Sequence, residues 1–283
     1  MYNEEEVRKM EIKCGAWSAR IEPECGNNVV SLCCGDAQIL RCPRDLAELH
    51  SRPCLYGIPL LFPANRLEDG RFFFEEQEYR MPINEPAFHN HIHGLLKDAP
   101  FQVKSQTPTR VAAFLENKGE YYPFPFVIEM EDTVSDSGFL RCLRLKNTGA
   151  HPMPYTLGFH CAFVPPEHFR VPIVKRCEMD DRYLPTGRLL ALDDRQTRYK
   201  TGMIPDGDKI SGVYTSAGHT VSIGQFTMEV SAQFDHWVLF NGTGNNGYLC
   251  IEPQCGGVNG LNTGKCSCLR PGEEAIFTLR IRK

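Results

Sequence analysis

The stretch "FTMEVSAQFD", residues 226–235, alternates apolar and polar side chains from end to end. In an extended strand, alternate side chains share one face, so this pattern predicts a strand with one buried face. The C-terminal "FTLRIRK", residues 277–283, repeats the alternation with Phe277, Leu279 and Ile281 expected to face inward. A period of two rather than 3.6 is typical of β-structure.

The same period extends outward along the chain. "FVIEME" (126–131) and "FLRCLRLKN" (139–147) predict two strands joined by the turn-forming "SDSG" at 135–138, and "RFFFEEQEYRM" (71–81) predicts a short hairpin. The only helices expected are brief, for instance around "RDLAELH" at 44–50. No linker or repeat is visible, so we expect an all-β protein, a large antiparallel β-sandwich forming a single domain over residues 1–283.

The bulk composition narrows the partners. The 283 residues are 42% hydrophobic and 23% charged, with a formal net charge of −4 and no cluster of Lys and Arg, so we expect no nucleic-acid partner. No run approaches the roughly 18 apolar residues of a membrane span, and residues 1–13 lack the apolar core of a signal peptide. We expect a cytoplasmic protein without a membrane partner, either a monomer or a homodimer.

Thirteen cysteines are many for a chain of this kind. Their number is odd, no C-x-x-C occurs, and a domain of this size does not need disulfides to hold it together. We expect mostly reduced, buried thiols that act as small hydrophobic side chains. This expectation also favours the cytosol.

Motifs for several chemistries are missing: no P-loop, dinucleotide fingerprint, nucleophile elbow or H-E-x-x-H occurs. "FHNHIHGLL", residues 88–96, instead carries His89, His91 and His93, which share one face in a regular strand. Together they could hold a metal ion, or one of them could act in catalysis while the other two have no role in it. A metal needs a further ligand, and the first acid after them is Asp98.

Three further residues have two readings each. His160 in "YTLGFHCAFVPP" (155–166) is either a core histidine bonded to a carbonyl or a general acid or base. Glu252 in "GYLCIEPQCGG" (247–257) is either a strand-end side chain in water or a buried carboxylate with a role. Arg66 in "PLLFPANRLEDGRF" (59–72) either forms a structural ion pair or binds the oxygens of a ligand.

Four segments in order resemble the aldose 1-epimerase family, the galactose mutarotases: "FPANRLEDGRFFF" (62–74), "NHIHGLL" (90–96), "LGFHCAF" (157–163) and "CIEPQCGGVNGLN" (250–262). The resemblance implies a large antiparallel β-sandwich. It implies interconversion of the α and β anomers of a free hexose such as galactose or glucose. It also implies that the partner is a small-molecule sugar and that no metal or other cofactor is needed.

The resemblance also implies roles. Glu252 is the expected base for the C1 hydroxyl, His160 the expected acid for the ring oxygen, and His93 a second histidine near that oxygen. Arg66 and Asn65 are the expected hydroxyl-binding pair. Ordinary pKa values keep glutamate ionised at neutral pH, and a nearby carboxylate favours the acid form of histidine. His89 and His91 stay outside the catalytic set.

The aspartate that this family uses on a sugar hydroxyl has no clean match. Asp208 in "PDGDKISGVY" (205–214) is the best-placed candidate, followed by Asp206.

Three rival functions stay open. A phosphorylated hexose would need extra cations, for which Arg66 with Arg71 or Arg182 are candidates. The other two are a non-catalytic sugar-binding protein, which would need no acid–base pair, and a metal-dependent enzyme built on His89, His91 and His93.

Overall fold

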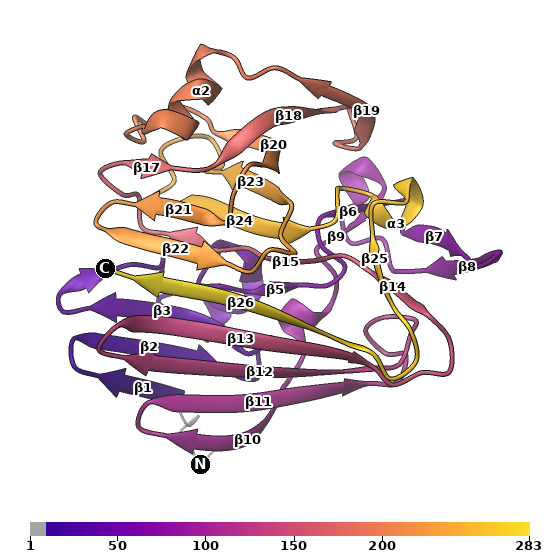
Figure 1. Ribbon diagram of the computed structural model, residues 1–283, viewed down its shortest axis with the longest axis horizontal. Helices are drawn as coiled ribbons and strands as arrows, with labels where there is room; N and C mark the ends of the chain where they lie inside the picture. The colour runs from indigo at the N-terminus through magenta and orange to yellow at the C-terminus, as the bar shows by residue number, and fades with distance from the viewer. Residues whose placement is uncertain (1–9) are drawn as a thin grey trace.

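Two large antiparallel sheets form a β-sandwich in the structure, a computed structural model that describes residues 10–283 (Figure 1). The first runs in the order β10 (Gln102–Thr107), β11 (Arg110–Asn117), β12 (Phe126–Ser135), β13 (Gly138–Asn147), β26 (Glu274–Arg282), β22 (Phe226–Val230), β21 (Thr220–Ile223), β17 (Phe169–Arg170). The second runs β19 (Pro185–Leu190), β18 (Ile173–Met179), β20 (Ser211–Ser216), β23 (His236–Phe240), β24 (Leu249–Cys255), β15 (Leu157–Phe159), β5 (Leu60–Leu61), with β16 (Ala162–Phe163) also paired to β24.

Shorter elements complete the fold. A four-stranded sheet contains β1 (Met10–Cys14), β2 (Trp17–Glu22), β3 (Asn28–Cys34) and β4 (Ala37–Gln38). Three strand pairs are β6 (Arg66–Glu68) with β9 (Asn90–Ile92), β7 (Arg71–Phe74) with β8 (Gln77–Arg80), and β14 (Met153–Tyr155) with β25 (Ser267–Leu269). The helices are α1 (Leu46–Ser51), α2 (Asp194–Thr201) and α3 (Gly260–Thr263), with 3₁₀ turns at Pro53–Leu55, Pro86–Phe88 and Leu96–Asp98.

Aromatic side chains join the layers of the sandwich. Phe234, just before β23, lies 5.8 Å from the ring of Phe159 and 5.4 Å from that of Phe277, which belong to different sheets. Phe62, just after β5, packs 5.0 Å from Phe126 of β12. Such edge and tilted ring contacts add to the burial of apolar surface that stabilises the core.

The period-two segments form the strands that their patterns predict. "FVIEME" and "FLRCLRLKN" lie in β12 and β13, and "RFFFEEQEYRM" forms the β7–β8 hairpin. Phe277, Leu279 and Ile281 of β26 are fully buried, and α1 forms where a brief helix was expected. Among residues 10–283, no helix has both the length and the apolar composition that a membrane span requires.

Residues 226–235 form a strand only in their first half. Strand β22 ends at Val230, and the chain then turns, with the N–H of Phe234 donating to the Ser231 carbonyl at 3.2 Å. Ala232 is consequently exposed, although the alternation placed it inward, whereas Phe234 is buried from the turn. The apolar–polar alternation of the sequence therefore runs past the end of the strand, because Phe234 is buried by tertiary packing although it lies in a turn.

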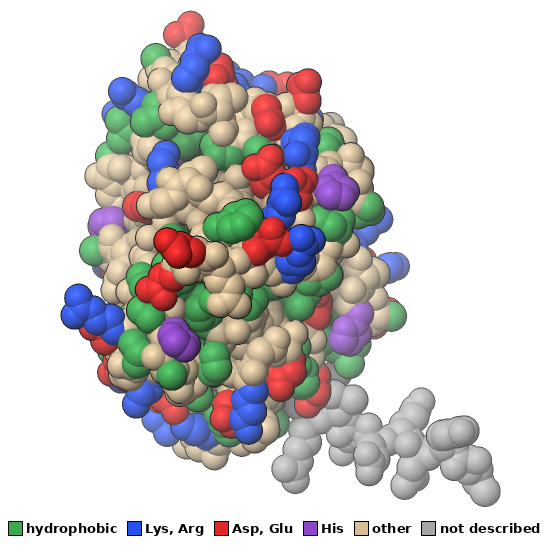
Figure 2. Space-filling model, turned by 90° about the vertical axis from the view of Figure 1, so that its right-hand side faces the viewer, with side chains coloured by type: hydrophobic (Ala, Val, Ile, Leu, Met, Phe, Trp, Pro, Cys, Tyr) green, Lys and Arg blue, Asp and Glu red, His purple; other side chains and the backbone are tan. Residues whose placement is uncertain are grey.

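All thirteen cysteines are free thiols. Only four are fully buried, namely Cys25, Cys161, Cys250 and Cys255, so the expectation of mostly buried thiols is too broad. The short strands β6 to β9 and helix α3 gather at one end of the molecule, on the right in Figure 1. Seen from that side, Figure 2 shows Lys and Arg side chains interspersed with Asp and Glu, without one continuous basic patch.

Candidate active site

Strand β24 carries the carboxylate of Glu252 in a fully buried segment, with the side chain 2% exposed. Its Oε2 accepts a hydrogen bond from Nε2 of Gln254 at 3.0 Å. Glu252 and Gln254 are two positions apart, so both side chains lie on the same face of the strand. Gln254 was not among the candidates from the sequence, although this two-residue spacing from Glu252 could have identified it.

His160 brings a ring nitrogen to the same carboxylate. The residue lies between β15 and β16, where its backbone N–H donates to the Pro59 carbonyl at 3.1 Å. Its Nε2 lies 3.2 Å from Oε1 of Glu252, and its side chain is 6% exposed. The structure therefore places the expected acid and base beside each other, at ion-pair distance.

His93 joins this pair from the other side. Its ring centroid lies 5.2 Å from that of His160, with the ring planes 89° apart. The backbone of His93 has a φ of 64° and its N–H donates to the Asn65 carbonyl at 2.9 Å. Gly94 follows with a φ of 65°, and a Cβ there would lie 1.8 Å from the Phe62 carbonyl oxygen. Only glycine tolerates so close an approach, and it allows the turn that aims His93 inward.

The three histidines do not share one face, because β9 covers only Asn90–Ile92 and positive φ angles flank it at His89 and His93. His89 is exposed, with Nδ1 3.0 Å from Oδ1 of Asp69. His91 is buried, and its Nδ1 donates to the Pro82 carbonyl at 2.7 Å. Residues 88–96 are therefore not a regular strand, and the shared face that such a strand would give the three histidines does not form.

Arg66 is held in a fixed orientation. Its Nε and Nη2 donate to the two carboxylate oxygens of Glu85 at 2.8 and 2.7 Å, and its guanidinium lies 4.7 Å from the ring centre of Tyr183. A forked pair of this kind orients the planar guanidinium. Asn65 contributes differently, because its Nδ2 donates to Oε1 of Gln254 at 3.1 Å and its Oδ1 accepts from the Arg66 N–H at 3.0 Å.

These residues surround a cavity of about 580 Å³. That volume suits a small molecule, and its lining mixes polar and apolar groups, as ligand sites do. Glu252, His160, His93, Arg66 and Asn65 all line it. The lining also contains the aromatic residues Phe88 and Tyr183, the acid Asp180 and the cations Arg176 and Lys209.

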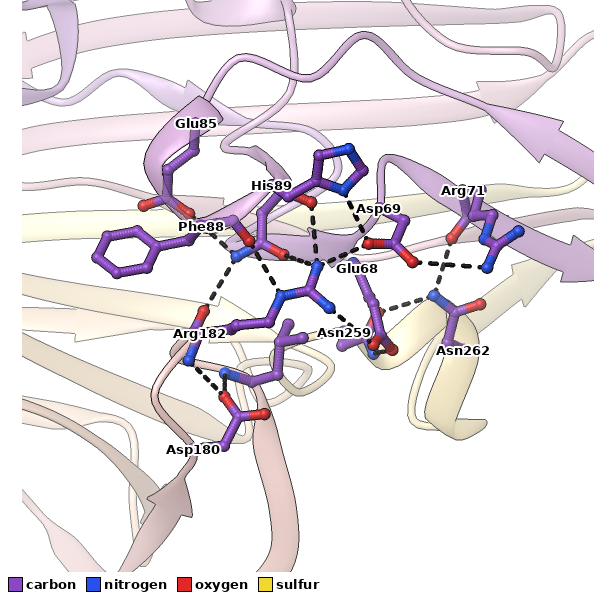
Figure 3. A network of polar contacts seen from close by, with 12 residues as sticks. Glu68, Asp69, Arg71, Glu85, Phe88, His89, Asp180, Arg182, Asn259 and Asn262 are labelled. Atoms are coloured by element: carbon purple, nitrogen blue, oxygen red, sulfur yellow. Dashed lines mark hydrogen bonds and ion pairs between the residues drawn. The ribbon is translucent and has the colours of Figure 1, made fainter.

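The tip of the β18–β19 hairpin closes one side of the cavity and is anchored by Arg182 (Figure 3). Nε of Arg182 donates to the Phe88 carbonyl at 3.0 Å, and Nη2 donates to Oδ1 of Asp69 at 2.7 Å and to the His89 carbonyl at 3.1 Å. The Arg182 carbonyl accepts from Nδ2 of Asn90 at 3.0 Å. This anchor positions the next residue, Tyr183, over Arg66. The link between the hairpin and residues 68–90 is tertiary, so no local pattern could have indicated it.

The remaining candidates lie elsewhere. Asp208 is outside the cavity lining, with a side chain 59% exposed and 3.4 Å from Nη2 of Arg195. Arg71 and Arg182 are also outside the cavity lining. Nη2 of Arg71 lies 3.5 Å from Oδ2 of Asp69. The cations that do so besides Arg66 are Arg176 and Lys209, which the sequence analysis did not single out.

Burial changes the protonation of the central pair. It raises the pKa of the Glu252 carboxyl to about 8, opposed by the hydrogen bond from Gln254 and the charge of Arg66. Burial lowers the pKa of His160 to about 4, and burial with the neighbouring His160 lowers the pKa of His93 further below its ordinary value. Both shifts favour the neutral forms, a protonated Glu252 beside an uncharged His160, contrary to the ionised glutamate expected from ordinary pKa values.

One group of side chains in the part of the chain that the structure describes could hold a metal ion. Within residues 10–283, His89, His91 and His93 do not form a ligand set. The group that does come together is His160, Cys250 and Glu252.

Comparison with known proteins agrees with the fold and the motifs. The family described as aldose 1-epimerase matches residues 16–282. The chain is 27% identical over 274 residues to the uncharacterized protein YihR of Escherichia coli K12, covering 85% of this chain and 88% of that protein. A galactose mutarotase-like protein from Clostridium acetobutylicum superposes with a TM-score of 0.88 at 26% identity, covering 96% of this chain and 93% of that one.

A second solved structure supports the fold alone. The putative aldose 1-epimerase of Escherichia coli K12 gives a TM-score of 0.82 at 14% identity, covering 97% of this chain and 98% of that one. The matched residues include every strand of the two large sheets. The chain therefore belongs to the aldose 1-epimerase family.

Proposed function

We propose that the protein is a mutarotase that interconverts the α and β anomers of a free hexose such as galactose or glucose. The observation that carries this proposal is the contact of 3.2 Å between Nε2 of His160 and Oε1 of Glu252, where both side chains line the 580 Å³ cavity. A carboxylate and an imidazole in this position can act as a base and an acid on neighbouring atoms of one sugar.

The chemistry requires one proton on the pair. Moving the proton of Glu252 to the neighbouring Nε2 of His160, 3.2 Å away, yields a carboxylate and an imidazolium without changing the proton count. The carboxylate then takes the proton of the C1 hydroxyl while His160 protonates the ring oxygen, and the bond between C1 and that oxygen breaks. Rotation about the C1–C2 bond and the reverse proton transfers close the ring as the other anomer.

Neighbouring residues prepare this pair for the sugar. Asn65 holds Gln254, and Gln254 holds Glu252, so we assign Asn65 a positioning role through that chain rather than a direct contact alone. Glu85 occupies the Nε and Nη2 side of Arg66, which leaves the other edge of the guanidinium for sugar hydroxyls. Low exposure of His160 and Glu252 limits competing solvent, which strengthens these electrostatic interactions.

The aromatic side chains offer an apolar surface for the sugar ring. Phe88 and Tyr183 line the cavity and pack edge to face, with ring centroids 4.9 Å apart. Tyr183 is 42% exposed, so its ring is accessible to a ligand. We assign Tyr183 as the aromatic contact of the sugar.

A second candidate is a hexose that carries an anionic group. Arg176 and Lys209 line the cavity, and neither forms an ion pair with a carboxylate among the residues that the structure describes. Two such cations could bind a phosphate on the substrate. The Arg71 and Arg182 considered for this purpose from the sequence are both engaged with Asp69 instead.

Polarimetry tests the proposal. Fresh α-D-galactose or α-D-glucose is dissolved at neutral pH with a chelator, and the optical rotation is followed with and without protein. We expect faster decay to the same end point, and no acceleration by the Glu252→Gln variant. Acceleration only with hexose 6-phosphates would select the second candidate. Decay equal to the blank for every sugar would refute catalysis and favour a sugar-binding protein.

A further inference from the structure

A buried thiol lies beside the proposed acid–base pair. Cys250 precedes Glu252 by two positions on β24, so both side chains lie on the same face of the strand. A ring nitrogen of His160, Sγ of Cys250 and a carboxylate oxygen of Glu252 all lie within 4.8 Å of one another. Cys250 is fully buried, and the mutarotase mechanism above does not use it.

We propose that His160, Cys250 and Glu252 form a binding site for a Zn²⁺-class ion at the floor of the cavity. One nitrogen, one sulfur and one oxygen ligand is a donor set that zinc accepts. Tetrahedral zinc with these ligands needs donor atoms about 3.5 Å apart, and the His160 and Glu252 atoms already lie at 3.2 Å. The Cys250 sulfur, which lies within 4.8 Å of both, has to move by no more than about 1.3 Å relative to them.

Charge balance also suits this class of ion. Binding removes the thiol proton of Cys250 and leaves Glu252 as a carboxylate, and both protons pass to solvent. The two negative ligands neutralise the double charge of the ion, which makes its burial tolerable. Three protein ligands leave a fourth position, and it faces the cavity because His160 and Glu252 line it. Magnesium and calcium prefer oxygen ligands and should not bind here.

The site predicts inhibition. The ion would occupy the carboxylate and imidazole that the proposed mechanism needs, so metal and sugar should compete. This consequence rests on the proposed function, whereas metal binding itself does not. The two can therefore be measured separately.

The binding test uses Co²⁺ on the full chain after treatment with a chelating resin. Because a thiolate ligand gives cobalt a charge-transfer absorption in the near ultraviolet, we expect such a band from wild-type protein and its loss when Zn²⁺ is added, but not when Mg²⁺ is added. Cys250→Ser should lose this band, and its affinity for Zn²⁺ should fall by more than about tenfold, since even outer-shell partners of a metal contribute about 10–100-fold.

A matched control lies on the same strand. Cys255 is buried like Cys250, but it is an odd number of positions from Glu252 and faces the other way. Cys255→Ser should keep the band. If Cys250→Ser does not fold, Cys250→Ala replaces it, because alanine packs without a buried hydroxyl group.

The outcomes separate the two ideas. No cobalt band, or a band that persists in folded Cys250→Ser or Cys250→Ala, would overturn the metal site. A Cys250-dependent band with competitive inhibition by Zn²⁺, relieved by a chelator and lost in the Cys250 variant, would establish it. A Cys250-dependent band without any effect on mutarotation would keep the metal site and count against the proposed roles of His160 and Glu252.

Discussion

Replacement of Glu252 by glutamine should abolish activity and stabilise the fold at the same time. The side chain is 2% exposed, and burial raises its pKa from an ordinary 4.5 to about 8. At neutral pH the folded protein must therefore hold a proton that the unfolded chain would release. An amide of the same shape would fit without that cost.

The magnitude follows from the size of the pKa change. Keeping the carboxyl protonated at neutral pH against an ordinary value of 4.5 costs about 3 kcal/mol of folding free energy. Because the folded pKa is raised, wild-type protein does not incur this cost below about pH 4.5, and the cost grows as the pH rises to about 8. The advantage of Glu252→Gln over wild type should therefore be near zero in mild acid and grow toward alkaline pH.

The assay is urea unfolding followed by circular dichroism at about pH 5, 7 and 8.5. Glu116→Gln, which changes an exposed carboxylate, is the matched control and should show no such trend. In parallel, polarimetry should show that Glu252→Gln lowers kcat by about 10²–10⁴-fold. A stability difference that is independent of pH, or a variant that is less stable at every pH, would refute the buried, protonated carboxyl.

Three further results are expected. Plotted against pH, kcat/KM should be bell-shaped, with limbs near 4 and 8. Below about pH 4 His160 and Glu252 are both protonated, and above about pH 8 the proton that they share is lost. Limbs only at the ordinary pKa values of glutamate and histidine would contradict this. Tyr183→Ala should raise KM by about 3- to 10-fold while Tyr183→Phe should not, since the ring face makes the contact, as initial-rate polarimetry can show. Arg182→Lys should speed hydrogen exchange at residues 180–184 and raise KM, because an ammonium cannot replace the forked donors of Arg182. His89→Ala, by contrast, should leave most of the activity.

The sequence by itself determined strands β7, β8, β12, β13 and β26, and the β22 part of residues 226–235. Alternation is a property of the extended backbone, so it indicated that Phe277, Leu279 and Ile281 of β26 face inward without any knowledge of their partners. It even extends to polar residues: Asp132 and Arg141 occupy inward positions, pair across β12 and β13, and form a fully buried ion pair with Nε of Arg141 2.8 Å from Oδ1 of Asp132. The motifs, in their order, indicated the family.

Tertiary structure decided the site. His89, His91 and His93 are neighbours in the sequence, yet backbone turns at positive φ send them to solvent, core and cavity. Glu252 and His160 come from distant segments, and only the pairing of β24 with β15 and β16 places them in contact. The physical reason is that the face of a strand residue follows from local backbone geometry, whereas burial, pKa and the contacts of a side chain depend on which distant segments pack against it.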